Sequence, residues 1–82
     1  MFMKTRKNQI GDKNIVGQKI AKIRIKKKIK QKDFIAQIQT AGLDMNPSSY
    51  SKLEGQFRSA TDKELYIISK LLNVDINDLF EP

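Results

Sequence analysis

The sequence predicts an all-α protein: a compact five-helix bundle with two short, tightly connected helices at its centre, preceded by a flexible basic arm. Three observations carry this prediction. Apolar residues recur at helical spacing in several separate segments, no segment alternates as a strand does, and helix-start signals stand between the apolar segments. With 82 residues, the chain has room for one domain with one small core.

The stretch from Gln31 to Gly55 is expected to form two short helices joined by a tight connection. The first carries an apolar face and is interrupted at Gly42. The second starts at Asn46-Pro47, where Asn46 can cap the helix and Pro47 suits its first position because it has no N–H group to leave unpaired. This second helix is expected to stop at Gly55.

The outer face of the second helix is polar and uncharged to basic. Tyr50 and Leu53 have the spacing of inward residues, and the outward residues are Ser48, Ser49, Ser51 and Lys52. A short helix with such a face, braced by another helix, fits the major groove of DNA. An ordinary helical hairpin with solvated serines fits this segment equally well.

The segments before Gln31 are expected to be an arm and a first helix. Residues 1–13 show no sustained period and are assigned to a flexible basic arm, whose cations either reach a neighbouring groove or belong to a disordered tail. Residues 14–82 are assigned to the helical domain. Asn14 is expected to cap a helix from about Ile15 to Lys28 with one apolar stripe.

Two further helices are expected after Gly55. Thr61 and Glu64 match a capping box, so a helix is predicted to begin there and to end near Asn73. Asp75 is expected to cap a last short helix that reaches about Phe80.

Charge is distributed unevenly within a net charge of +7. Residues 1–32 hold twelve Lys and Arg residues against one acidic residue, whereas residues 59–82 hold two basic and five acidic residues. Such a basic first third suggests a polyanionic partner, although a lysine-rich helix face can also be merely solvated.

The composition argues against several classes of function. There is no Cys and no His, which removes disulfides, thiolate metal sites and the commonest general base. We therefore predict no catalytic residue, no metal, no cofactor and no small-molecule ligand. The apolar runs are too short to span a membrane, and no secretory signal is visible, so a cytoplasmic protein is expected.

Four stretches together resemble a known family: IVGQKIAKIR, IKQKDFIAQI, SSYSKLEG and ATDKELYIISKLLNVDINDLF. They resemble the lambda-repressor-like (Cro/C1-type, Xre) helix-turn-helix domains over about residues 14–80. The resemblance implies five helices, of which the second and third read DNA.

The resemblance also implies roles for individual residues. It places base contacts at Pro47, Ser48, Ser49 and Lys52. It places phosphate contacts at Gln31 and Arg58, and the flanking Lys30 and Lys32 are expected to join them. It implies a structural ion pair between Arg24 and Glu54.

The chain departs from the family pattern at three positions. Lys30 stands at the usual Ser/Thr capping site of the second helix, which costs about 1 kcal/mol in typical hosts. Ile35 stands where the family prefers a small residue, so the second and third helices are expected to lie further apart. Gln56 takes the place of the usual glycine after the third helix.

The resemblance and the charge predict sequence-specific binding of double-stranded DNA by a transcriptional regulator, most simply a repressor. A homodimer on an operator is possible, with Leu79, Phe80 or Phe57 as contacts that could equally be core. The alternative is a protein-interaction module, such as the antitoxin component of a two-component system, because fold alone does not fix function.

Overall fold

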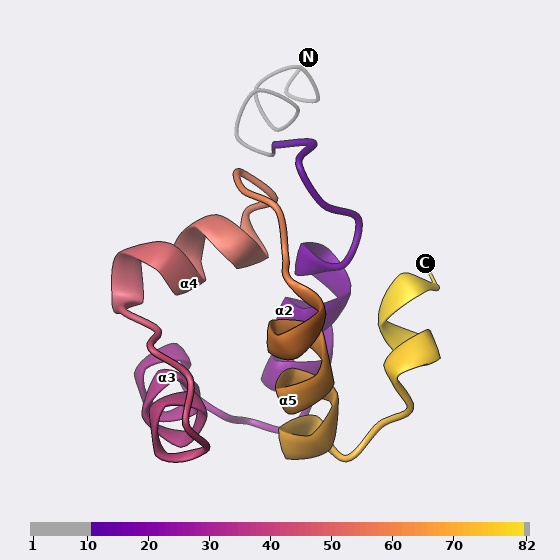
Figure 1. Cartoon of the computed structure of the whole chain (residues 1–82). Helices are drawn as coiled ribbons and strands as arrows, with labels where there is room; N and C mark the ends of the chain where they lie inside the picture. The colour runs from indigo at the N-terminus through magenta and orange to yellow at the C-terminus, as the bar shows by residue number, and fades with distance from the viewer. Residues whose placement is uncertain (1–10, 82) are drawn as a thin grey trace.

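The computed structural model describes residues 11–81, and every regular element in this range is helical (Figure 1). The elements in chain order are α2 (Gly17–Lys26), α3 (Gln31–Thr40), α4 (Pro47–Glu54), α5 (Asp62–Leu72) and the 3₁₀ helix η1 (Ile76–Phe80). The all-α prediction is confirmed. The predicted count of five α-helices is wrong, because the last segment has only five residues and forms the tighter 3₁₀ turn that short segments favour.

Helix α2 begins at Gly17 rather than near Ile15, because Asn14 shapes the chain before the helix. The side-chain oxygen of Asn14 accepts a hydrogen bond from the N–H of Gly17 at 2.8 Å. Its side-chain amide donates to the backbone carbonyls of Leu53 and Arg58, at 3.1 and 2.8 Å. Asn14 therefore joins the entry of α2 to the end of α4.

Side-chain caps fix the starts of α4 and α5. Asn46 accepts a hydrogen bond from the N–H of Ser49 at 2.7 Å, and Pro47 takes the first helical position. Thr61 and Glu64 form both halves of a capping box at the start of α5. These caps satisfy N–H groups that have no partner inside the helix, so the two starts follow from the local sequence.

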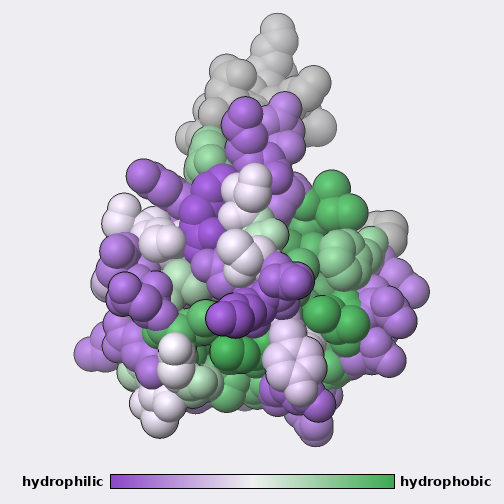
Figure 2. Space-filling view, in the orientation of Figure 1, coloured by the Kyte–Doolittle hydropathy of each residue, from purple (hydrophilic) through white to green (hydrophobic). Residues whose placement is uncertain are grey.

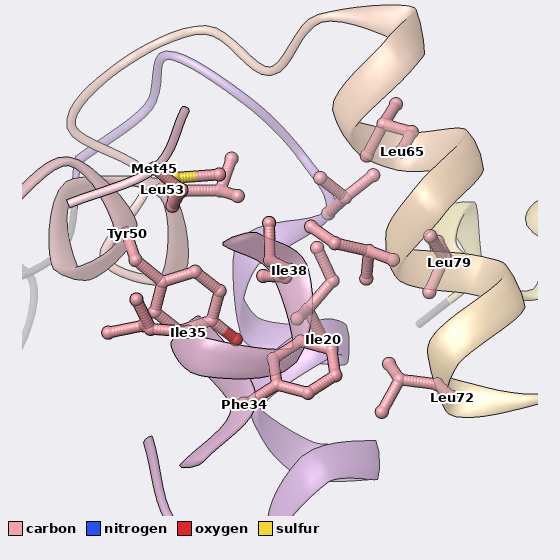
Figure 3. Packing of buried hydrophobic residues seen from close by; sticks show 12 residues of the cluster. Ile20, Phe34, Ile35, Ile38, Met45, Tyr50, Leu53, Leu65, Leu72 and Leu79 are labelled. Atoms are coloured by element: carbon pink, nitrogen blue, oxygen red, sulfur yellow. The ribbon is translucent and has the colours of Figure 1, made fainter. Parts of the chain in front are cut away.

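The core lies between the four α-helices and η1 (Figure 3). The Phe34 ring of α3 meets the Tyr50 ring of α4 edge to face, with centroids 5.8 Å apart and an interplanar angle of 69°. Ile35 is 5% exposed, so the core accommodates the residue that was expected to separate α3 from α4. The buried apolar residues are Val16, Ile20, Phe34, Ile35, Ile38, Met45, Tyr50, Leu53, Leu65, Ile68, Leu72 and Leu79.

The chain leaves α4 through a left-handed residue. Gly55 keeps right-handed geometry with φ −80°, and Gln56 takes φ +65°. Left-handed geometry costs a non-glycine residue roughly 1–2 kcal/mol. The Gln56 side chain offsets part of this cost because its amide donates to the carbonyl of Asn14.

The end of the predicted arm is attached to this exit. The N–H of Gly11 donates to the carbonyl of Gly55, and the N–H of Lys13 donates to the carbonyl of Gln56, both at 2.8 Å. Residues 11–13 are therefore held by backbone bonds rather than loose. Residues 1–10 of the predicted arm lie outside the described residues.

Gly17 allows α2 and α4 to approach each other closely. A Cβ atom at this position would lie 2.4 Å from the carbonyl oxygen of Leu53 and 2.5 Å from that of Glu54. Both atoms belong to the backbone of α4, which cannot rotate away. Any side chain at position 17 must therefore displace one helix from the other.

We expect Gly17→Ala to destabilise the protein by about 1–3 kcal/mol, the usual cost of overpacking a filled interior. Urea unfolding followed by circular dichroism would measure this loss. Gly55→Ala is a matched control, because a Cβ atom there mainly meets the ring of Phe57, which is half exposed and can move. Equal losses from both variants would contradict this account of Gly17.

Candidate nucleic-acid interface

The exposed face of α4 is set by two buried side chains on its opposite side. Tyr50 and Leu53 are fully buried, which turns Ser48, Ser51 and Lys52 to the exposed side. These three residues follow helical i, i+3, i+4 spacing and so form one stripe. In Figure 2 the surface over α4, on the left, is hydrophilic to neutral, whereas hydrophobic surface lies toward η1.

The four predicted base-contacting residues do not all lie on this stripe. Pro47, Ser48 and Lys52 are exposed, but Ser49 is partly buried and its backbone carbonyl accepts a hydrogen bond from Arg58 at 3.0 Å. Ser51 is exposed and takes the position expected of Ser49. The i, i+3 spacing from Ser48 was the sequence signal for Ser51.

The start of α3 lies beside α4 and is basic. Lys30 and Lys32 are exposed, and Gln31 between them is partly buried. Lys30 occupies the N-cap position with no side-chain cap. The first-turn N–H groups of α3 are therefore available to an anion, as at other helix N-termini that bind phosphate.

Gln31 links the start of α3 to α4. Its amide nitrogen Nε2 donates to Oε1 of Glu54 at 3.2 Å. Its amide oxygen accepts from Oγ of Ser51 at 3.4 Å. The predicted phosphate-contacting residues of α3 and the exposed stripe of α4 therefore form one continuous surface.

A buried ion pair stands behind this surface. Arg24 Nε and Glu54 Oε2 are 2.7 Å apart, and the two side chains are 10% and 9% exposed. A second bond joins Nη2 to Oε1 at 3.3 Å, and Nη1 donates to the carbonyl of Ile29 at 2.7 Å. The guanidinium thus connects α2, the residue before the α3 cap and the last residue of α4.

The contacts around this ion pair also shift the pKa values of Arg24 and Tyr50. The hydrogen bond that Arg24 donates to Glu54 raises the pKa of Arg24 and outweighs the opposing effect of burial. Burial, followed by the bond to Glu54, raises the pKa of Tyr50, whose hydroxyl donates to Oε2 of the carboxylate. Tyr50 therefore stays a donor and Arg24 stays a cation at any physiological pH.

We expect Glu54→Ala to destabilise the protein by about 3–5 kcal/mol, because it leaves the Arg24 cation buried without its partner. Chemical unfolding at neutral pH would measure the loss. Lys52→Ala, an exposed change on the same helix, should stay within about 0.5 kcal/mol of the wild type. A Glu54→Ala protein as stable as Lys52→Ala would show that the pair has no net stabilising role.

Arg58, which was predicted to contact a phosphate, makes hydrogen bonds within the protein. Its Nη1 and Nη2 atoms donate to the two carboxylate oxygens of Glu64 at 2.9 and 3.0 Å. The same guanidinium donates to the carbonyls of Ser49 and Ser59. Arg58 therefore joins α4 to the first turn of α5, and its charge is already paired.

The contact with Arg58 helps to lower the pKa of the Glu64 carboxyl. Burial raises its pKa, but hydrogen bonds from Arg58 and from the backbone N–H of Thr61 lower the pKa by more, so it lies below the ordinary value of 4.5. A carboxyl whose pKa is lowered by folding stabilises the protein above its unfolded pKa. This stabilisation is lost as pH falls through the folded value.

We expect Glu64→Gln to destabilise the protein at pH 7 by about 1–3 kcal/mol, the range for hydrogen bonds to charged groups. Glutamine can retain the capping box, so the change removes mainly the charge. The gap between wild type and variant should shrink as pH falls below 4.5, which urea titrations from pH 7 to 3 would measure. Exposed Glu81→Gln is the control, and a pH-independent gap for Glu64→Gln would contradict the assignment.

A scan against protein-family models, a search of curated proteins and a search of solved structures each found no match to this chain. Over residues 11–81, no helix combines the length and apolar character needed to cross a membrane. The same residues contain no group of three or more His, Cys, Asp or Glu side chains that could hold a metal ion. Apart from the exposed carboxylate of Asp33 in the first turn of α3, the chemistry gathered on the candidate surface consists of cations, hydroxyls and amides.

Proposed function

We propose that the protein is a sequence-specific double-stranded DNA-binding regulator of transcription, acting as a repressor, in which α3 and α4 form a helix-turn-helix. One observation carries the proposal. The exposed Ser48–Ser51–Lys52 stripe of α4 adjoins the lysine-flanked, uncapped start of α3, and the buried Arg24–Glu54 pair fixes the two relative to each other.

Helix α4 has the dimensions and donors for base reading. An α-helix with its side chains is about 10–12 Å in diameter, which a B-DNA major groove about 12 Å wide accepts, and the eight residues of α4 are about 12 Å long. Lys52 can donate to O6 and N7 of guanine, and Ser48 can donate or accept. Pro47 offers only an apolar contact, such as one with a thymine methyl group.

The start of α3 supplies the phosphate contacts. Lys30 and Lys32 bring charge, and the first-turn N–H groups and the Gln31 amide bring directional donors. Release of condensed counterions by these lysines and by those of α2 provides affinity without sequence preference. Occupation of an operator in this way blocks polymerase sterically.

A second copy of the chain is the partner that we include in this proposal. Of the three apolar residues considered for such a contact, Leu79 is buried, whereas Phe57 and Phe80 are about half exposed. Phe80 lines a groove together with Ile15, which is 72% exposed. Lysines of α2 and Glu81 also line this groove, so two copies related by a twofold axis can place opposite charges against each other.

The proposal is tested by incubating the protein with a random-sequence DNA duplex pool at low and at near-physiological salt and sequencing what is retained. We expect an enriched motif at the higher salt, and two inverted half-sites in that motif would indicate a dimer. Retention only at low salt, without a motif, would contradict the proposal and favour the alternative of a protein-interaction module.

We expect Lys52→Ala to relax base preference at one position of the motif by about 1–3 kcal/mol. The Lys30→Ala, Lys32→Ala double variant should instead weaken binding to all sequences and lower the salt slope by roughly 2. Competition binding on motif variants and salt titrations would measure the two effects. Lys70→Ala on α5, outside the proposed surface, is the control. If Lys52→Ala instead weakened binding equally on every sequence, Lys52 would be a phosphate contact.

A further inference from the structure

The hydrogen bonds around Glu54 fix the orientation of the Gln31 amide. Oε1 of Glu54 accepts from Arg24 and from Gln31, and Oε2 accepts from Arg24 and Tyr50. An ionised carboxylate is an acceptor only, so the group that Gln31 presents to it must be the amide NH₂. The amide oxygen of Gln31 then points away from Glu54.

The amide oxygen in turn fixes the hydroxyl of Ser51. Oγ of Ser51 lies 3.4 Å from Oε1 of Gln31. An amide oxygen cannot donate, so Ser51 is the donor in this contact, which is longer than the roughly 2.5–3.0 Å usual for O–H···O bonds. In this arrangement the hydroxyl turns its lone pairs toward any other partner.

Ser51 presents these lone pairs on the proposed DNA-reading stripe. It is exposed and stands one helical turn after Ser48 and next to Lys52. By contrast, no residue within 11–81 holds the Ser48 hydroxyl, which remains able to rotate and either donate or accept. The two serines, identical in chemistry, thus differ in what they offer to a base edge.

We propose that Ser51 is a specificity-determining residue that accepts a hydrogen bond from a base amino group and so selects adenine or cytosine over guanine or thymine at one position. In the major groove the only hydrogen-bond donors are N6 of adenine and N4 of cytosine, whereas guanine and thymine present acceptors. Lone pairs facing these acceptors would repel them. This inference rests on the proposed function, since it names the chemistry that the same surface recognises.

The test repeats the duplex selection with wild type, Ser51→Ala and Gln31→Leu proteins. We expect Ser51→Ala to reduce the preference for adenine or cytosine at one motif position by roughly two- to tenfold, the value of one net hydrogen bond. Gln31→Leu should admit guanine and thymine at that same position, because the Ser51 hydroxyl regains its donor. Melting curves would establish that both variants are folded.

Ser59→Ala, at an exposed serine in the loop before α5 and outside the candidate surface, is the matched control and should leave the preference at the Ser51 position unchanged. A wild-type motif that Ser51→Ala leaves intact at every position would overturn the inference but not the proposed function. A wild-type preference for guanine or thymine at the position that Ser51→Ala affects would likewise overturn the inference but not the proposed function. No enriched motif for the wild type would instead remove the proposed function, and this inference with it.

Discussion

The arrangement of the candidate surface depends on the Arg24–Glu54 ion pair. Glu54 is the last residue of α4, where the helix dipole disfavours a negative charge. The carboxylate is stable there because the guanidinium supplies two hydrogen bonds and Tyr50 and Gln31 supply two more. An eight-residue helix is marginal in isolation, so the position of α4 comes from such tertiary bonds rather than from helix propensity.

Polar side chains hold α4 along its length from the inner side. Arg58 bonds to the carbonyl of Ser49 in the first half of the helix, and Asn14 bonds to the carbonyl of Leu53 near its end. Gly17 allows α2 to pack directly against the same end. Because these contacts use backbone carbonyls and buried side chains, the outward side chains of α4 remain available for binding.

Local signals made the helices predictable, whereas tertiary contacts decided the details of the site. Asn46-Pro47 and the Thr61–Glu64 capping box act within a few residues, so the starts of α4 and α5 could be predicted. The spacing of Tyr50 and Leu53 predicted the exposure of Ser51, whereas the partial burial of Ser49 accompanies the contact of Arg58 with its carbonyl, which the sequence pattern does not specify.

Arg58 shows that the pairing of a charge also depends on tertiary contacts rather than on local sequence. A cation in a loop gives no sign of being paired until the fold brings a carboxylate to it, and Glu64 was assigned only as a cap. The short 3₁₀ geometry of η1 and the left-handed Gln56 likewise depend on the tertiary setting. In each case the residue type allowed several roles, and distant contacts selected one.

The contacts of Asn14 have a consequence for the order of folding. They join residues 39 and 44 positions apart in the chain, so they close only after most of the domain has been synthesised and collapsed. Contacts of such separation carry a large loop-closure entropy and slow folding. The attachment of the end of α4 to the entry of α2 is therefore expected to be among the last contacts of the domain to form.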